Sequence, residues 1–229
     1  HDWLSELMRP LAVDSRIGIA GCKIFFDDGQ TLQHTGGLVS YPQALTDHHG
    51  YLQPDTGAYD VLIDADYVTS AAMAMRKTML DQIGYLDASF FPIYYDDADI
   101  CYRARAAGWR VVYVPKAVLT HLESATMGRH SYRYLASLHR SRMRFVLKHL
   151  SLEQLLQDFV PAEAAWLRKA KLPEERRALC KDYKAALLMV PEIYGARDGY
   201  DESTFDAVDE ATGALVSLPE WVYYRSDQG

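Results

Sequence analysis

Apolar positions along the first half of the chain switch between the helical and the strand period. Residues 2–12 place apolar side chains three and four positions apart, which predicts an amphipathic helix. A nearly continuous apolar run over 16–26 predicts a buried strand, and the acidic turn at 27–29 ends it. Small and apolar residues over 60–75 predict a second sheet region, and a short helix over 76–84 follows it and ends at a glycine. The pattern predicts a mixed α/β domain.

Two polar segments lie between the first strand and the second sheet region. In residues 31–39 we interpret the glycine pair at 36–37 as a backbone device, and His34 as structural rather than catalytic. Residues 40–59 are rich in proline and glycine and predict a long loop, a length that usually signals function or disorder. The histidines at 48–49 could suggest a metal site, but adjacent side chains rarely bind the same ion. We therefore interpret this loop as a lid or an acceptor-binding segment.

The chemistry of the chain is concentrated in residues 91–105, where an aromatic run ends in Asp96, Asp97 and Asp99 and a helical pattern begins. An aspartate at a helix start caps free N–H groups and meets the positive end of the dipole. One aspartate is enough for that role, and Asp96 and Asp97 repel each other. Two interpretations stay open: a cap with a solvated face, or a general base at a pocket mouth beside aromatic side chains.

The order of elements after the carboxylates is equally regular. Gly108 ends the helix, residues 109–115 predict a strand, and a short apolar run over 117–121 ends at His121. We expect the strand at 109–114 to lie next to a strand at 68–75. This order of carboxylates, helix, glycine, strand, proline and histidine forms one continuous pattern.

That pattern resembles the second half of a family 2 glycosyltransferase with the GT-A fold. The resemblance covers about residues 1–150, and the paired aspartates with their spacing to His121 are especially similar to galactofuranosyl- and rhamnosyl-transferase-like members. It implies an α/β fold: a partial GT-A mixed sheet with a C-terminal helical appendage. The positions that carry the resemblance are Asp96, Asp97, Asp99, Arg103, Gly108, Pro115 and His121.

The resemblance also implies roles for individual residues. Asp97 matches the general base of an inverting transfer, and Asp99 caps the helix or pairs with Arg103 one turn later. Ser70 stands where the family usually has a glycine that contacts the sugar-nucleotide. The residues implied to bind substrate are Ser70, Ala71, Tyr95, Asp96 and Arg103.

The same resemblance implies a metal. His121 matches the late histidine that, with an Asp-x-Asp motif, holds Mn²⁺ or Mg²⁺ against the leaving diphosphate. The Asp-x-Asp motif is expected just upstream of a sequence like that at 3–7, and the chain begins at His1. We therefore expect the missing N-terminal half of the same protein as a partner, and little or no turnover by this chain alone. The implied substrates are a nucleotide-sugar donor and a glycan or lipid-linked acceptor of cell-envelope polysaccharide.

Two other functions remain open. The first is a non-catalytic carbohydrate-binding or scaffold domain descended from a glycosyltransferase. The second is a metal-dependent hydrolase that uses Asp96, Asp97 and His121, but no second His-Asp cluster in the sequence supports it. An upstream Asp-x-Asp motif would distinguish a transferase from a scaffold.

The second half of the chain has a different character. No acid occurs over 124–152, and this stretch predicts a long helix with a basic side at 129–149. That side is either simply solvated, or it binds an anion such as a diphosphate or the lipid of a membrane surface. The predicted organisation is a catalytic half at 1–125, a helical extension at 126–194 and an extended tail at 195–229.

Composition sets the remaining bounds. With 49% hydrophobic and 24% charged residues, the 229-residue chain is typical of a soluble globular protein, and no apolar run reaches the ~20 residues of a membrane span. A net charge of −7 gives no reason to expect nucleic acid. Three scattered cysteines, Cys22, Cys101 and Cys180, argue for a reducing compartment. We therefore expect a cytoplasmic location, with the basic helix in peripheral contact with the inner face of the membrane.

Overall fold

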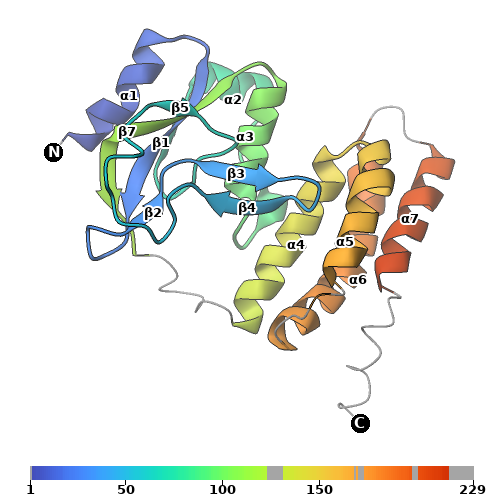
Figure 1. The fold of residues 1–229 in the computed structure, drawn as a ribbon. Helices are drawn as coiled ribbons and strands as arrows, with labels where there is room; N and C mark the ends of the chain where they lie inside the picture. The colour runs from blue at the N-terminus through green and yellow to red at the C-terminus, as the bar shows by residue number, and fades with distance from the viewer. Residues whose placement is uncertain (1, 123–130, 168, 170–172, 198–200, 217–229) are drawn as a thin grey trace. The chain divides into compact units, whose positions relative to one another are not determined.

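The computed structural model describes residues 2–122, 131–167, 169, 173–197 and 201–216 (Figure 1). The chain divides into two compact units. The first, which we call the α/β unit, comprises residues 1–40, 46–91 and 95–125. The second, which we call the helical unit, comprises residues 41–45, 92–94 and 126–229.

The sheet of the α/β unit is organised around β1 (Ile17–Phe25), a strand that is buried at all but its last position. One edge of β1 pairs in parallel with β7 (Arg110–Thr120), and the other pairs antiparallel with β6 (Met73–Met75) and β2 (Leu32–His34). At the outer edge, β5 (Ile63–Asp64) runs antiparallel to β7. The continuous apolar run of β1 reflects this central place, because a strand covered on both faces does not alternate.

The prediction of which strand lies next to β7 is therefore wrong. The strand at 109–114 was predicted next to that at 68–75, but β1 lies between β7 and β6. The doubly buried β1 takes the centre of the sheet, so each of the other two strands takes one of its edges. β7 is also longer than predicted, since it continues past Pro115 through a register shift between Cys22 and Lys23 of β1.

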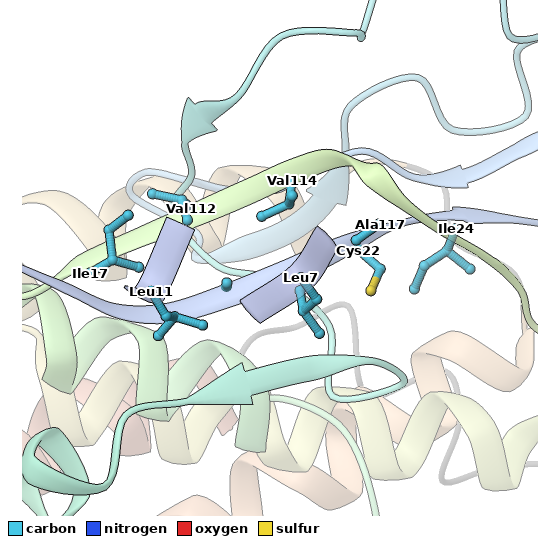
Figure 2. Packing of buried hydrophobic residues seen from close by; sticks show 9 residues of the cluster. Leu7, Leu11, Ile17, Cys22, Ile24, Val112, Val114 and Ala117 are labelled. Atoms are coloured by element: carbon cyan, nitrogen blue, oxygen red, sulfur yellow. The ribbon is translucent and has the colours of Figure 1, made fainter. Parts of the chain in front are cut away.

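The core of the α/β unit lies between its first helix and the sheet. Along α1 (Trp3–Val13), Leu7 and Leu11 are one turn apart and point toward β1 and β7 (Figure 2). They pack there with buried side chains that include Ile17 and Val112. Burial of each such side chain contributes about 1.5–3 kcal/mol, so these contacts hold the helix on the sheet.

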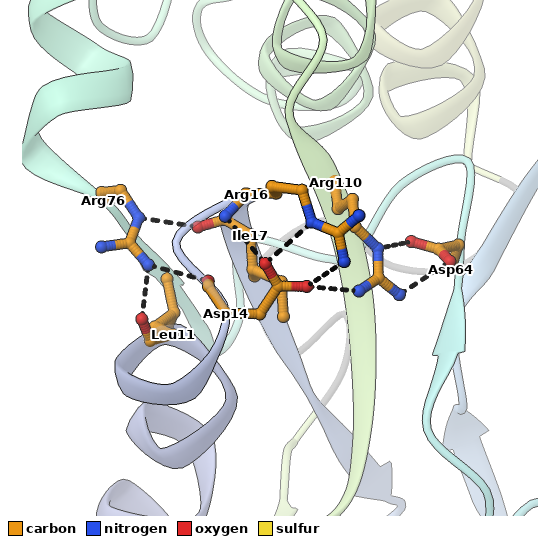
Figure 3. A network of polar contacts seen from close by, with 7 residues as sticks. All are labelled: Leu11, Asp14, Arg16, Ile17, Asp64, Arg76 and Arg110. Carbon is orange, nitrogen blue, oxygen red and sulfur yellow. Dashed lines mark hydrogen bonds and ion pairs between the residues drawn. The ribbon is translucent and has the colours of Figure 1, made fainter.

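A polar network fixes the end of the same helix (Figure 3). The guanidinium of Arg76 donates hydrogen bonds to the backbone oxygens of Leu11, Asp14 and Ile17. Leu11 lies in the last turn of α1, whose carbonyls have no partner within the helix. Arg110 at the start of β7 bridges Asp14 at 2.8 Å and Asp64 at 2.9 Å. One network thus joins the end of α1 to β1, β5 and β7.

Three short helices complete the α/β unit: α2 (Lys77–Ile83), η1 (Ala88–Phe90) and α3 (Asp96–Ala106). Two of the three cysteines lie in this unit and are buried, Cys22 on β1 and Cys101 on α3. Burial raises the pKa of the Cys22 thiol to about 12, and it raises the pKa of Cys101 as well. Neither thiol is therefore a nucleophile at neutral pH.

The helical unit consists of α4 (Tyr132–His149), the π-helical η2 (Gln154–Phe159), α5 (Val160–Leu167), α6 (Pro173–Gly195) and α7 (Glu202–Val216). Its centre holds a buried ion pair: Arg142 of α4 donates to Glu163 of α5 at 2.5 and 3.1 Å. The hydroxyl of Tyr183 donates to the same carboxylate, and the Trp166 ring lies 5.1 Å from the guanidinium. Full burial of both charges makes this pair the polar centre of the bundle.

Two sequence-based expectations fail. The expected loop at 40–59 contains part of a two-stranded sheet, β3 (Gly37–Ser40) with β4 (Leu45–His48). The expected extended tail at 195–229 contains α7, because Val208, Ala211 and Leu215 recur at helical spacing and are buried. The tail beyond residue 216, with Trp221 to Tyr224, lies outside the described residues.

The basic side predicted at 129–149 is only partly exposed to solvent. Arg142 is buried, and Arg144 pairs with Glu192 at 2.7 Å, so two of its cations are neutralised inside the helical unit. Arg140 and Arg133 remain exposed, while Arg129 lies outside the described residues. Within the described residues, none of the helices combines the length and apolar character that crossing a bilayer requires.

Candidate active site

The acidic cluster begins at an abrupt turn of the backbone. Tyr94 and Tyr95 have φ angles of 78° and 64°, in the left-handed region that residues other than glycine rarely occupy. Each such residue costs about 1–3 kcal/mol, and such strain concentrates at functional sites. Immediately after the turn, Asp96 and Asp97 form the first turn of α3. The turn therefore places both carboxylates at the helix start, where N–H groups are unpaired.

Asp97 is held by the backbone on both sides. Its Oδ1 accepts a hydrogen bond from the N–H of Ala98 at 2.8 Å, and its Oδ2 accepts one from the N–H of Ser70 at 3.2 Å. The Thr69 hydroxyl is a further donor. The structure thus brings together two residues that the sequence placed in one site, Asp97 and Ser70, with Ala71 next in the chain. Ser70 and Ala71 are exposed, so a ligand can reach this position.

Burial shapes the acidity of this pair. Burial, and after it the neighbouring charge of Asp96, raise the pKa of Asp97 to about 6 against the opposing hydrogen bonds from Ser70, Ala98 and Thr69. Burial also raises the pKa of Asp96, and the charge of Asp99 adds to it. A carboxylate whose pKa lies near neutrality can take up and release a proton at physiological pH. A simple helix cap would show the opposite shift, because its N–H donors favour the ionised form.

Asp99 and Arg103 form the predicted pair one helical turn apart, which is confirmed at 2.9 Å. Asp99 is fully buried, and the guanidinium of Arg103 also donates to the carbonyls of Ile83 and Tyr85, each at 2.8 Å. These contacts tie α3 to the chain that leaves α2. Binding of substrate by Arg103, like that by Tyr95, stays a prediction, and Tyr95 is itself 3% exposed.

The glycine pair allows the chain to pack closely against Tyr67, three positions before Ser70. Gly36 has a φ of 98°, and a Cβ on Gly37 would lie 2.2 Å from the ring of Tyr67, so the predicted backbone role is confirmed. Tyr67 is buried, and its hydroxyl donates to the carbonyl of Asp47 at 3.3 Å. Sequence reasoning missed Tyr67 and Thr69, although they lie three and one positions before Ser70, which it singled out.

His121, the predicted metal ligand, lies just beyond the end of β7. Its N–H donates to the carbonyl of Phe25 at 2.9 Å, and its ring Nδ1 lies 2.7 Å from Oε1 of Gln33. The Nε2 of Gln33 donates to the carbonyl of His121 at 3.1 Å. Sequence reasoning did not single out Gln33, because a glutamine inside a short strand gives no signal of its own.

The fit of a metal to these residues is limited. Among the described residues, no three His, Cys, Asp or Glu side chains lie close enough to hold an ion together. His121 offers one imidazole nitrogen, which is a suitable ligand for Mn²⁺ but one of several that an ion needs. Of the hydrogen bonds in the described part of the chain, none joins Asp97 to His121.

Comparison with known proteins gives matches over the first two thirds of the chain. A family model described as glycosyltransferase-like family 2 matches residues 2–146. An uncharacterized protein of Sinorhizobium fredii, y4gI, is 31% identical over 131 residues, or 56% of this chain and 14% of that protein. The N-acetylglucosaminyl-diphospho-decaprenol L-rhamnosyltransferase of Mycobacterium tuberculosis is 31% identical over 80 residues, 35% of this chain and 26% of that protein. The O-antigen biosynthesis protein RfbC of Myxococcus xanthus is 29% identical over 130 residues, 54% and 10% respectively.

These matches span between about a tenth and a quarter of the relatives' own lengths. The matched region includes the acidic turn, α3, β7 and His121. The similarity therefore covers the elements that hold both Asp97 and His121.

Proposed function

Because the chain belongs to the glycosyltransferase-like family 2, we propose that it carries the acceptor side of an inverting glycosyltransferase, with Asp97 as the general base. The observation that carries this proposal is the state of Asp97. Its carboxylate is held by two backbone N–H groups next to the exposed Ser70, and its pKa is raised to about 6. A base of this strength is ionised at neutral pH and still accepts a proton readily.

The proposed reaction is one displacement at the anomeric carbon of a nucleotide-sugar. The hydroxyl of a glycan or lipid-linked acceptor attacks this carbon and loses its proton to Asp97, while the bond to the nucleotide diphosphate breaks. Asp96 positions the acceptor hydroxyl, and the backbone at Ser70 and Ala71 approaches the donor closely. The names of the Mycobacterium and Myxococcus relatives support a role in cell-envelope polysaccharide synthesis.

The leaving diphosphate calls for a cation. We propose that Nε2 of His121 is one ligand of Mn²⁺ or Mg²⁺, with carboxylates of an Asp-x-Asp motif outside this chain as others. When bound, such an ion neutralises the charge that develops on the diphosphate. His121→Ala in the complete enzyme should raise the Mn²⁺ concentration needed for half-maximal activity. An unchanged Mn²⁺ titration in that variant would mean that His121 only ends the strand.

Two parts of the proposal concern the chain as a whole. The 229 residues alone should turn over a nucleotide-sugar slowly or not at all, because they carry the base without the motif that anchors the diphosphate. Robust transfer by the purified chain would contradict this. We also propose that the exposed Arg133 and Arg140 of α4 contribute to peripheral contact with the inner face of the membrane.

The test of the central proposal compares Asp97→Asn with Asp96→Asn in the complete enzyme. Loss of a general base lowers turnover by about 10²–10⁴-fold, so Asp97→Asn should fall in this range with donor affinity unchanged. Asp96→Asn should mainly raise KM for the acceptor. Normal turnover per folded molecule in Asp97→Asn would exclude the base. Carbohydrate binding without transfer by the complete wild-type protein would instead favour a scaffold.

A further inference from the structure

One buried amide makes two contacts with the same histidine. Gln33 lies in the middle of β2 and is 3% exposed. A buried amide is costly unless its polar atoms are hydrogen-bonded. Both ends of this amide are bonded to His121: Nε2 to its backbone carbonyl at 3.1 Å, and Oε1 to its ring Nδ1 at 2.7 Å. The two residues are far apart in the sequence, so the pairing depends on the fold.

These two contacts together determine which ring nitrogen carries the proton. A backbone carbonyl can only accept a hydrogen bond, so the group of Gln33 that faces the His121 carbonyl must be the NH₂. The other end of the amide, which faces the ring, is then its oxygen. An amide oxygen can also only accept, so Nδ1 of His121 must donate and must carry the hydrogen in the neutral ring.

We infer that Gln33 is the positioning residue of His121, whose ring it holds as the Nδ1–H tautomer with the lone pair on Nε2. Of the hydrogen bonds that His121 makes within the described part of the chain, none involves Nε2. A histidine ligand is commonly oriented in this way by a hydrogen bond to its other nitrogen. The use of Nε2 as a metal ligand rests on the proposed function, but the tautomer does not.

The backbone of Gln33 is itself held in place. Its backbone carbonyl lies 2.9 Å from Nδ1 of His48, and this carbonyl too can only accept. Its strand neighbours are equally fixed, because Leu32 is fully buried and His34 pairs with Ile24 of β1. The sheet thus fixes the backbone of Gln33, while burial of its side chain and the two bonds to His121 hold its amide.

The direct test is the ring tautomer of His121 in the 229-residue chain. The chain would be labelled with ¹⁵N-histidine and recorded at about pH 8.5, well above the usual histidine pKa of about 6.5. The His121 signals are identified by their loss in His121→Ala. We expect one dominant species protonated at Nδ1. A ring protonated at Nε2 in the wild type would overturn the inference, whatever the variants do.

Variants then separate positioning from a merely structural tie between β2 and β7. In Gln33→Leu the tautomer ratio should shift by about tenfold toward Nε2–H, the size expected from losing one hydrogen bond. Gln33→Glu should keep Nδ1–H, because a carboxyl oxygen can still accept from it. Gln53→Leu, which removes an exposed amide elsewhere in the α/β unit, is the matched control and should change nothing. An unshifted ratio in Gln33→Leu would also overturn the inference.

The link to the proposed metal has its own readout. In the complete enzyme, Gln33→Leu should raise the Mn²⁺ requirement by about 10–100-fold, as the loss of a residue that orients a ligand typically does. If the tautomer shifts and the Mn²⁺ requirement does not, the metal role of His121 is wrong while the positioning by Gln33 stands. Failure of the proposed function and failure of this inference are thereby distinguished.

Discussion

Replacing Asp97 with asparagine should make the α/β unit more stable at neutral pH while it removes the proposed base. The folded protein disfavours the ionised form of Asp97, because the pKa of this carboxyl is raised from 3.8 to about 6. Each unit corresponds to 1.36 kcal/mol between the two protonation states, so the ionised form destabilises the fold by up to ~3 kcal/mol. An asparagine carries no charge and escapes this term.

The gain should be smaller than this limit. The amide of an asparagine has one accepting oxygen, whereas both oxygens of Asp97 accept from backbone N–H groups, of Ala98 and Ser70. Loss of one such hydrogen bond costs about 1 kcal/mol. The net expectation is a gain of about 1–2 kcal/mol in the free energy of unfolding, or roughly 2–4 °C in Tm for each kcal/mol.

The pH dependence gives the prediction its sharpest form. The folded pKa lies above the unfolded one, so above about pH 6 the carboxyl is ionised in both states and the native state bears the full cost. As the pH falls from 6 toward 3.8, native Asp97 takes up a proton and the cost disappears. The advantage of Asp97→Asn should therefore be complete above pH 6 and absent below about pH 4.

Urea denaturation of both proteins at several pH values measures this difference, and hydrogen exchange of the β1 amides reports the α/β unit separately. Asp27→Asn, in the exposed turn after β1, serves as the control and should show no such gain. A stability gain that does not change with pH would rule out the charge as its cause. A loss of stability at pH 8 would refute the reasoning and restore Asp97 as an ordinary helix cap.

Three further predictions follow from the same contacts. In the complete enzyme, kcat/KM should fall below about pH 6 as Asp97 is protonated, and a flat pH–rate profile from pH 5 to 8 would contradict this. Arg142→Met should destabilise the helical unit by about 3–5 kcal/mol in chemical denaturation, because it leaves the charge of Glu163 buried without its cation, whereas Arg142→Met combined with Glu163→Leu should recover most of that loss. Gly37→Ala should lower Tm by several degrees, since its methyl group would overlap the Tyr67 ring, and an unchanged Tm would show that the ring can move aside.

Local patterns predicted much of the α/β unit correctly. The fold class, a mixed α/β sheet of partial GT-A type followed by helices, is confirmed by the sheet and by the family match. The elements α1, β1, α2 and α3 were each placed to within a few residues, because their apolar periods and glycine ends are strong local signals. Strand neighbours were not predictable in this way, because pairing depends on which strand can be buried on both faces.

The site was partly predictable for the same reason. Asp97 and Ser70 were both singled out from the sequence, and the structure joins them by a hydrogen bond. The burial and the hydrogen bonds that set the pKa of Asp97 depend on the fold. The left-handed backbone at Tyr94 and Tyr95 depends on it as well. Gln33 shows the limit most clearly, because its partner His121 lies just beyond the end of β7, far from Gln33 in the sequence. No local pattern identifies such a pair.

The difference in burial between the three cysteines allows thiol labelling to follow the opening of the α/β unit. Cys22 and Cys101 are buried in the α/β unit, while Cys180 on α6 is half-buried. A thiol-specific dye applied briefly at neutral pH should therefore attach to the helical unit without any engineered cysteine. The two buried thiols become available to the dye only when the sheet opens. The slow phase of labelling would then measure the rate at which β1 and α3 open, and α3 carries the acidic pair directly after the strained tyrosines.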